Sequence, residues 1–343
     1  MDPLLLTRKP IESTQYHTGV VIPVYFAEGI DCSSGVALLE DTVRAYCAVL
    51  GDPGRICLSV DGAAYGADEA VEIADDCGTS VHVSEQNTGK LGAAQRGVRV
   101  LLAKSEVNYV AIVDQDGDHF ANELLNLVRV AEHVCQRTDR GQVLVLGQRV
   151  SRHRPMGFLR GELEEVADRV LLDALAYRAA MTGRPLRLEY AACMGEFPDF
   201  HSGYKLFDRV TAERVFLDPP RQAGVSDTCY CRHAVEAVMV VEALEAGAYL
   251  GTVNRTTINE QPISTFGQYN LSQLVADKII WPCKRLQVPL VFVEQWLANH
   301  AQRVLLHTLR PEGVQELQRI RQLVSAAYDP ARQPDPLLQP LFL

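Results

Sequence analysis

Three carboxylates at alternate positions end an apolar stretch near the middle of the chain. The stretch is YVAIVDQDGDH, residues 109–119, and its acids are Asp114, Asp116 and Asp118. Side chains two positions apart on an extended chain point to the same side, so we expect these carboxylates to converge. Carboxylates held together repel one another unless a cation lies among them. Oxygen ligands favour Mg²⁺ or Mn²⁺, which usually also hold substrate phosphates, so the pattern predicts a divalent-metal site.

Two other interpretations of this stretch need weighing. A calcium loop of the EF-hand type has Gly at its sixth position and Glu at its twelfth. Those positions are His119 and Leu125 here, which excludes that loop. A solvated acidic turn without any metal is the remaining alternative, because acidic residues are common in turns.

The acids lie in a regular alternation of apolar runs and helical segments. Apolar runs with β-branched residues predict strands at residues 19–26, 55–63, 81–87, 109–113 and 142–149. Helical periodicity separates them at residues 36–50, 67–78, 87–105 and 120–137. Strands that alternate with helices through short connections predict an α/β fold, with a mostly parallel sheet flanked by helices on both faces.

This topology predicts where the polar groups meet. The carboxyl ends of parallel strands lie at one edge of the sheet, and open α/β sheets bind their ligands there. We therefore expect one crevice that gathers the residues following the strands: Tyr25, Asp61, Asn87 to Lys90, the acids from Asp114 onward, and Arg149.

The rest of the chain is less regular. Residues 1–17 are interpreted as a loosely held arm, and residues 161–183 and 226–247 as helices. Residues 189–209 carry polar groups, glycines and aromatics typical of a site, and residues 249–264 form a strand with polar interruptions. We divide the chain into residues 18–150 and 151–265, two halves of one domain, and residues 266–343, a C-terminal extension with three helices and a Pro-rich tail.

Composition narrows the class of protein. The 343 residues are 47% apolar and carry a net charge of −10 without a basic tract, which disfavours nucleic acid as the main partner. Nine Cys without C-x-x-C spacing indicate reduced thiols and a cytoplasmic protein. The chain has no signal-peptide core and no run of about 18 apolar residues, so we expect no transmembrane segment.

Six motifs in order resemble family 2 glycosyltransferases of the GT-A fold, especially the polyprenyl-phosphate mannosyl- and glucosyltransferases. VVIPVYFAEGI is similar to that family's V-I-P-x-Y-N-E, SVDGA to its V-D-D-G-S, and NTGKLGAAQRGV to its N-x-G-K-x-x-A-x-N-x-G turn. VDQDGDHFANEL resembles D-A-D-x-Q-H-x-P-E-x-L, LGQR resembles G-S-R, and DFHSGYKLFDR resembles D-x-x-S-G-F-R-L-F-x-R. Together they cover roughly residues 19–265.

The resemblance implies transfer of a hexose from a UDP- or GDP-sugar. It implies Asp116 as the main ligand of Mg²⁺ or Mn²⁺, Asp118 as a second ligand, and Asp114 near the ribose or behind the metal. The other expected donor-binding residues are Pro23, Tyr25, Asp61, Asn87, Lys90, Gln115, Arg149 and Lys205. Lys205 stands where the family has Arg, so a bidentate contact would be lost there.

The resemblance also implies a general base, Asp199, that deprotonates the acceptor hydroxyl, with inversion at the anomeric centre. Glu196 and His201 are competing candidates. The acceptor is left open among a sugar, a lipid phosphate and a small metabolite. The family's transmembrane helices are missing, although residues 277–297 could contact a membrane or cover the acceptor site, and a homo-oligomer stays open.

Two alternatives in function stay under consideration. A nucleotidyltransferase or sugar-nucleotide pyrophosphorylase usually carries a basic phosphate loop after its first strand, and the corresponding loop here, FAEGIDCSSG, has no Lys or Arg. A non-catalytic nucleotide-sugar-binding protein is disfavoured because Asp116 and Asp199 are both retained.

Overall fold

A seven-stranded sheet forms the centre of the computed structural model, which describes residues 5–29, 31–138, 141–191, 197–258, 270–301 and 312–335. The strands are β1 (Thr18–Val24), β2 (Ile56–Val60), β3 (Ser80–Val83), β4 (Tyr109–Ile112), β5 (Val143–Arg149), β6 (Lys205–Asp208) and β7 (Tyr249–Arg255). Their order is β3-β2-β1-β4-β6-β5-β7, and all neighbours are parallel except the two pairs made by β6. The predicted fold class, a mostly parallel sheet flanked by helices, is confirmed.

Alternate residues of the strands enter two separate cores, as the pleat of a strand requires. In β1, Val21 faces one core while Val20 and Ile22 face the other. The same alternation in β4 sends Val110 to the first core and Ala111 to the second. Strands buried on both faces are apolar throughout, which explains why these runs lacked a polar face in the sequence.

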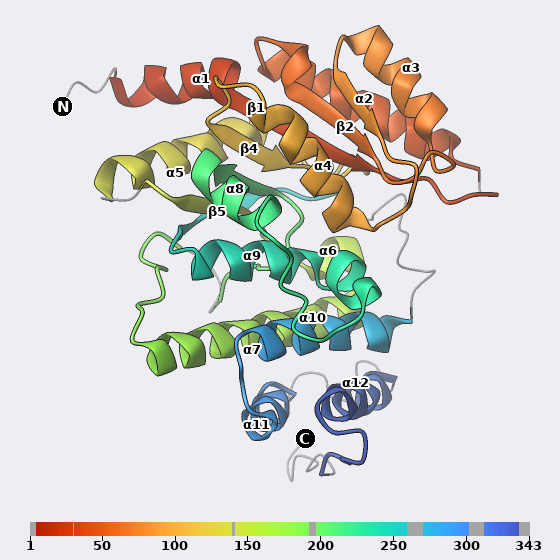
Figure 1. The fold of residues 1–343 in the computed structure, drawn as a ribbon, viewed down its shortest axis with the longest axis vertical. Coiled ribbons are helices and arrows are strands. Elements are labelled where there is room, and N and C mark those ends of the chain that lie inside the picture. The colour runs from red at the N-terminus through yellow and green to blue at the C-terminus, as the bar shows by residue number, and fades with distance from the viewer. Residues whose placement is uncertain are drawn as a thin grey trace.

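Helices cover both faces of the sheet (Figure 1). One face packs against α2 (Ser33–Val49), α3 (Ala67–Cys77) and α5 (Leu124–Arg137). The other packs against α4 (Lys90–Leu102), α8 (Arg209–Phe216) and α9 (Val235–Glu245), and α7 (Phe158–Thr182) lies beyond α9 in the same apolar core (Figure 1). The short α6 (His153–Met156) precedes α7.

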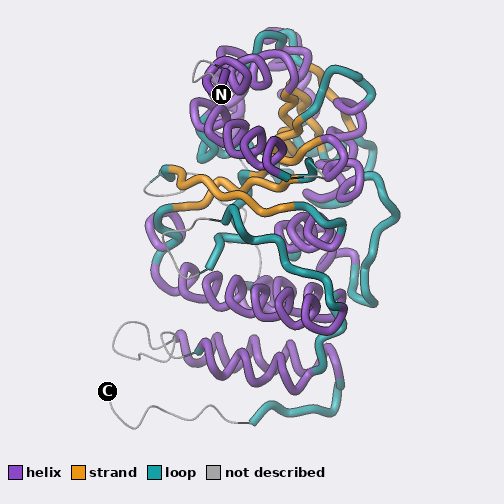
Figure 2. The backbone as a smooth tube through the Cα atoms, turned by 90° about the vertical axis from the view of Figure 1, so that its left-hand side faces the viewer, coloured by secondary structure: helices purple, strands orange, loops and turns teal. Residues whose placement is uncertain are grey.

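The predicted C-terminal helices are α10 (Leu271–Arg285), α11 (Leu290–His300) and α12 (Glu312–Tyr328). Helix α10 packs along α7, and α11 and α12 form a further layer on the side away from the sheet (Figures 1 and 2). In the part of the chain that the structure describes, no helix is both long and apolar enough to span a membrane.

Three local predictions were wrong. The arm is a helix, α1 (Leu5–His17), which is held against α5 because Ser13 and Lys9 both contact the Glu132 carboxylate, at 2.7 and 2.8 Å. The short antiparallel strand β6 was missed because it has only four residues and begins with a charged one, Lys205. The helix expected over residues 226–247 is broken into a π-helical turn, Cys229–His233, followed by α9.

Candidate active site

A cavity of about 260 Å³ opens at the carboxyl edge of the sheet. Ten residues predicted from the sequence line it: Pro23, Tyr25, Asp61, Lys90, Asp114, Gln115, Asp116, Asp118, Arg149 and His201. The expected crevice is therefore formed, and its lining extends along the chain from Pro23 to Lys278. Asn87, Asp199 and Lys205 lie behind this lining, and Glu196 lies outside the described residues.

The acidic loop after β4 is a turn and not an extended segment. Gly117 has a φ of 79°, a left-handed conformation that suits glycine, and the chain reverses there. Both oxygens of Asp118 are engaged: Arg255 Nη1 donates to its Oδ2 at 3.0 Å, and the amide of Ile258 donates to its Oδ1 at 2.7 Å. All three carboxylates line the cavity, but the contacts of Asp118 argue against it as a metal ligand.

Asp116 is the carboxylate best suited to a cation. It is half-buried, and one oxygen accepts a hydrogen bond from the Asp118 amide at 3.2 Å. Burial and then the neighbouring Asp114 raise the pKa of Asp116 to about 6. The described residues contain no group of three or more side chains arranged to hold a metal. Asp116 and Asp114 nevertheless fit Mg²⁺ or Mn²⁺, because such ions use one or two carboxylates together with substrate phosphates.

Lys90 lies beside this acidic pair at the start of α4. Its ammonium contacts Asp114 Oδ1 at 2.5 Å and Glu236 Oε1 at 2.7 Å. Glu236 also pairs with the fully buried Lys205, at 2.5 Å, so one carboxylate bridges two lysines. Burial opposes the charge on Lys90, but the two carboxylates outweigh it and raise the pKa of Lys90. Lys205 is thus a buried partner of Glu236, which contradicts its predicted contact with the donor.

The glycine turn before α4 is held from two sides. Both oxygens of Asp61 are engaged, since the amides of Thr88 and Gly89 donate to Oδ1 and Oδ2 at 2.8 and 2.7 Å. Arg96 adds an ion pair to Asp61 at 2.8 Å. On the other side, the guanidinium of Arg232 donates to the Asn87 side chain at 2.5 Å. These contacts give Asp61 and Asn87 the role of shaping the turn, in place of the predicted donor contacts.

Tyr25 is fixed at the cavity wall by Gln115. The Tyr25 amide donates to the Gln115 side-chain oxygen at 2.8 Å, and the Gln115 amide group donates back to the Tyr25 carbonyl at 2.9 Å. The ring of Tyr25 packs on Tyr65, with centroids 5.1 Å apart. This pairing joins the acidic loop to the end of β1.

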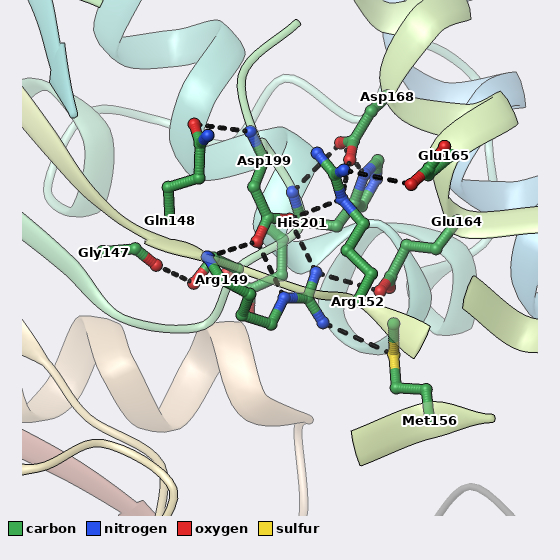
Figure 3. Close-up of polar contacts among 12 residues, drawn as sticks. Gly147, Gln148, Arg149, Arg152, Met156, Glu164, Glu165, Asp168, Asp199 and His201 are labelled. Atoms are coloured by element: carbon green, nitrogen blue, oxygen red, sulfur yellow. Dashed lines mark hydrogen bonds and ion pairs between the residues drawn. The ribbon is translucent and has the colours of Figure 1, made fainter. Parts of the chain in front are cut away.

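On the opposite side, Arg149 and Asp199 form a buried ion pair (Figure 3). Arg149 Nε and Nη2 donate to the two carboxylate oxygens of Asp199 at 2.7 and 2.6 Å, and Nη2 also lies 3.0 Å from Glu164. Burial alone would raise the pKa of Asp199, but Arg149 and then Arg152 outweigh it and hold that pKa well below its ordinary range. A weakly basic, fully buried carboxylate outside the cavity lining is a poor proton acceptor.

These contacts correct two predictions. Asp199 is not placed to act as the general base, because its oxygens are occupied and do not reach the cavity. Arg149 does line the cavity, but its bidentate edge faces Asp199 and is not available to a phosphate in this arrangement.

Several cavity residues were missed by sequence reasoning. They all follow β5 in the chain: Arg160, Glu164, Arg232, His233, Glu236, Arg255 and Lys278. Glu236 had a signal, since it is a lone acid at the start of the apolar helical run VEAVMVV. Arg160, Glu164 and Lys278 gave no such signal, because a charged residue on an amphipathic helix ordinarily faces water.

Comparisons with known proteins were made for the chain as a whole. Neither a scan against protein-family models nor a search of curated proteins found a match. Among solved structures, the chain is similar to glucosyl-3-phosphoglycerate synthase from Mycobacterium tuberculosis, crystallised with phosphoglyceric acid and with Mg²⁺ and UDP. These two comparisons have a TM-score of 0.49, identities of 15% and 16%, and cover 83% of this chain and 85% and 84% of the other.

The chain is also similar to residues 1–349 of TarS from S. aureus, with 11% identity, a TM-score of 0.41 and 92% of each chain covered. At such low identity and TM-score these similarities identify neither a substrate nor a reaction for this chain.

Proposed function

We propose that this protein is a metal-dependent glycosyltransferase that moves a hexose from a UDP- or GDP-sugar to an acceptor hydroxyl or phosphate. One observation carries the proposal: each of the six motifs that resemble family 2 glycosyltransferases contributes to the same cavity. The contributing residues are Tyr25, Asp61, Lys90, the acids Asp114 and Asp116, Arg149 and His201.

Asp116, with Asp114, would hold Mg²⁺ or Mn²⁺. The ion would neutralise charge that develops on the diphosphate leaving group, without any proton transfer. Lys90 is bound to Asp114 and so lies within reach of the same phosphates. Tyr25 presents a ring at the wall where the base would lie.

The acceptor would enter between α7 and α10. Arg160 and Lys278 line that side of the cavity, and Lys278 is anchored by Glu164 on α7. Two cations beside one carboxylate favour an acceptor with an anionic group, such as a phosphate or carboxylate next to its reacting hydroxyl. Among the acceptors left open above, we therefore favour a small anionic metabolite or a lipid phosphate over a neutral sugar.

Calorimetric titration with UDP and GDP, each with and without Mg²⁺ or Mn²⁺, tests the proposal. We expect one nucleotide to bind much more tightly when metal is present, and Asp116→Asn to abolish that difference. Asp41→Asn is the matched control, because Asp41 is an exposed carboxylate on α2. Absence of binding for both nucleotides under all conditions would overturn the proposal.

The reaction products separate the proposal from the nucleotidyltransferase alternative. With UDP-glucose or GDP-mannose as donor, a glycosyltransferase releases the nucleoside diphosphate. A pyrophosphorylase instead consumes or releases pyrophosphate. If pyrophosphate is released or consumed and the sugar 1-phosphate stays intact, the alternative replaces the proposed reaction.

A further inference from the structure

His201 is a buried histidine that lines the cavity. Its side chain is fully buried, and it lies in the segment between Asp199 and the start of β6. Its Nδ1 is 2.7 Å from Oδ1 of Asp168 on α7, and its backbone amide donates to the same oxygen at 3.2 Å. Two contacts to one carboxylate oxygen fix both the position and the rotation of the ring.

The bond to Asp168 also determines which ring nitrogen carries the proton. An ionised carboxylate only accepts hydrogen bonds, so Nδ1 must be the protonated nitrogen of the neutral ring. Nε2 then has a lone pair. Among the described residues Nε2 has no hydrogen-bond partner, although it is buried, and the residue lines the cavity. Buried polar atoms without partners are rare, and at a cavity wall they indicate a group that a ligand satisfies.

Asp168 is itself firmly held. It is completely buried, and Arg152 Nε lies 3.2 Å from its second oxygen, Oδ2 (Figure 3). The Arg152 guanidinium lies over the ring of Phe197, 4.9 Å from the centroid, and contacts Glu165 at 3.4 Å. The carboxylate therefore has a counter-charge on one side and the imidazole on the other, which keeps the histidine oriented.

We propose that His201 is the general base of the transfer reaction and that Asp168 is its positioning residue. This inference rests on the proposed glycosyltransferase function and assigns a role that Asp199 cannot fill in this structure. His201 Nε2 takes the proton of the acceptor O–H as that oxygen forms a bond to the anomeric carbon. The bond from the anomeric carbon to the diphosphate oxygen breaks, and its electron pair leaves with the nucleoside diphosphate. Asp168 stabilises the imidazolium that results.

The proton position can be tested without any substrate. Two-dimensional ¹⁵N–¹H spectra at about pH 8, above the ordinary range of histidine, report the tautomer of each ring. The His201 signals are assigned by their loss in His201→Gln. We expect the Nδ1–H tautomer in the wild-type protein and a shift toward Nε2–H in Asp168→Asn, where an amide donor replaces one oxygen. A wild-type ring protonated at Nε2 would overturn the proposal, because no lone pair would face the cavity.

Kinetics test the role in catalysis, with UDP-glucose and GDP-mannose as donors and Mg²⁺ present. Water and azide serve as acceptors: water must lose a proton to form a stable product, whereas azide attacks without losing one. His201→Gln should lower nucleoside diphosphate release to water by about 100-fold or more, a typical contribution of a general base. Its KM for the donor should stay within about threefold, and azide should restore release in the variant far more than in the wild type.

His300 and Asp173 provide matched controls, because they form a second histidine–aspartate pair, 2.6 Å apart, that does not line the cavity. His300→Gln and Asp173→Asn should leave both reactions unchanged. Release by His201→Gln within threefold of wild type, or an equal loss with water and azide, would overturn the base role while leaving the glycosyltransferase proposal intact. No release by the wild-type protein from either donor would overturn both.

Discussion

Replacement of Asp116 by Asn should make the metal-free protein more stable. Burial and the neighbouring Asp114 raise the pKa of Asp116 from its ordinary value of 3.8 to about 6. At neutral pH the Asp116 carboxylate is therefore ionised in the folded protein, although the folded site disfavours the ionised form. At about 1.36 kcal/mol per pKa unit the cost approaches 3 kcal/mol. Solvent in the cavity screens this half-buried group, so we expect about 1–2 kcal/mol. Asn carries no charge and avoids the cost.

Urea denaturation in the presence of a chelator measures this difference. The gain from Asp116→Asn should be complete above about pH 6, decrease as the pH falls toward 3.8, and vanish below it, because the wild-type carboxyl is then protonated in both states. Asp41→Asn, on the exposed face of α2, should change the free energy of unfolding by less than about 0.5 kcal/mol. A variant that is no more stable than wild type at about pH 7.5 would refute this reasoning.

Three further outcomes follow from the same site. Asp118→Asn should lower the free energy of unfolding by about 3 kcal/mol, because it breaks the buried pair with Arg255, and should retain metal-dependent nucleotide binding. Unchanged stability in denaturation together with lost metal-dependent binding in calorimetry would instead make Asp118 a metal ligand. Gly89→Ala should cost about 2 kcal/mol, because φ is 93° and its Cβ would lie 2.6 Å from the Cys231 carbonyl; an unchanged melting temperature would contradict this. Lowering the pH from about 7.5 to about 5 should weaken Mg²⁺-dependent nucleotide binding about tenfold, since protons compete for Asp116; affinity independent of pH in calorimetry would argue against it as a ligand.

The gathering of the cavity residues could be predicted because it depends on strand topology. The apolar runs that became β1, β2, β4 and β5 were evident in the sequence, and the loops that follow parallel strands share one edge. Tyr25, Lys90, Asp116 and Arg149 reach the cavity for this reason. Strand topology alone predicts that these residues reach the sheet edge, whatever contacts each side chain makes there.

The partners themselves were beyond sequence reasoning. Asp118 is neutralised by Arg255, 137 positions later in the chain, and Lys90 by Glu236, 146 positions later. No local pattern records such pairs, because they depend on how the second half of the chain packs against the first. Strand β6 is the clearest case: it inserts antiparallel between β4 and β5, and the segment before it carries Asp199 into contact with Arg149.

By itself, the sequence determined the class of fold, the edge of the sheet at which the cavity opens and ten of the residues found there, since hydrophobic periodicity and strand direction are local properties. Only the tertiary structure decided which of those residues can act. Whether a carboxylate binds a cation, accepts a proton or merely balances a buried arginine depends on the charges and donors within a few ångströms. Those neighbours are set by packing: Asp116 lies beside Asp114 and Asp118, Asp199 is occupied by Arg149, and His201 is held by Asp168.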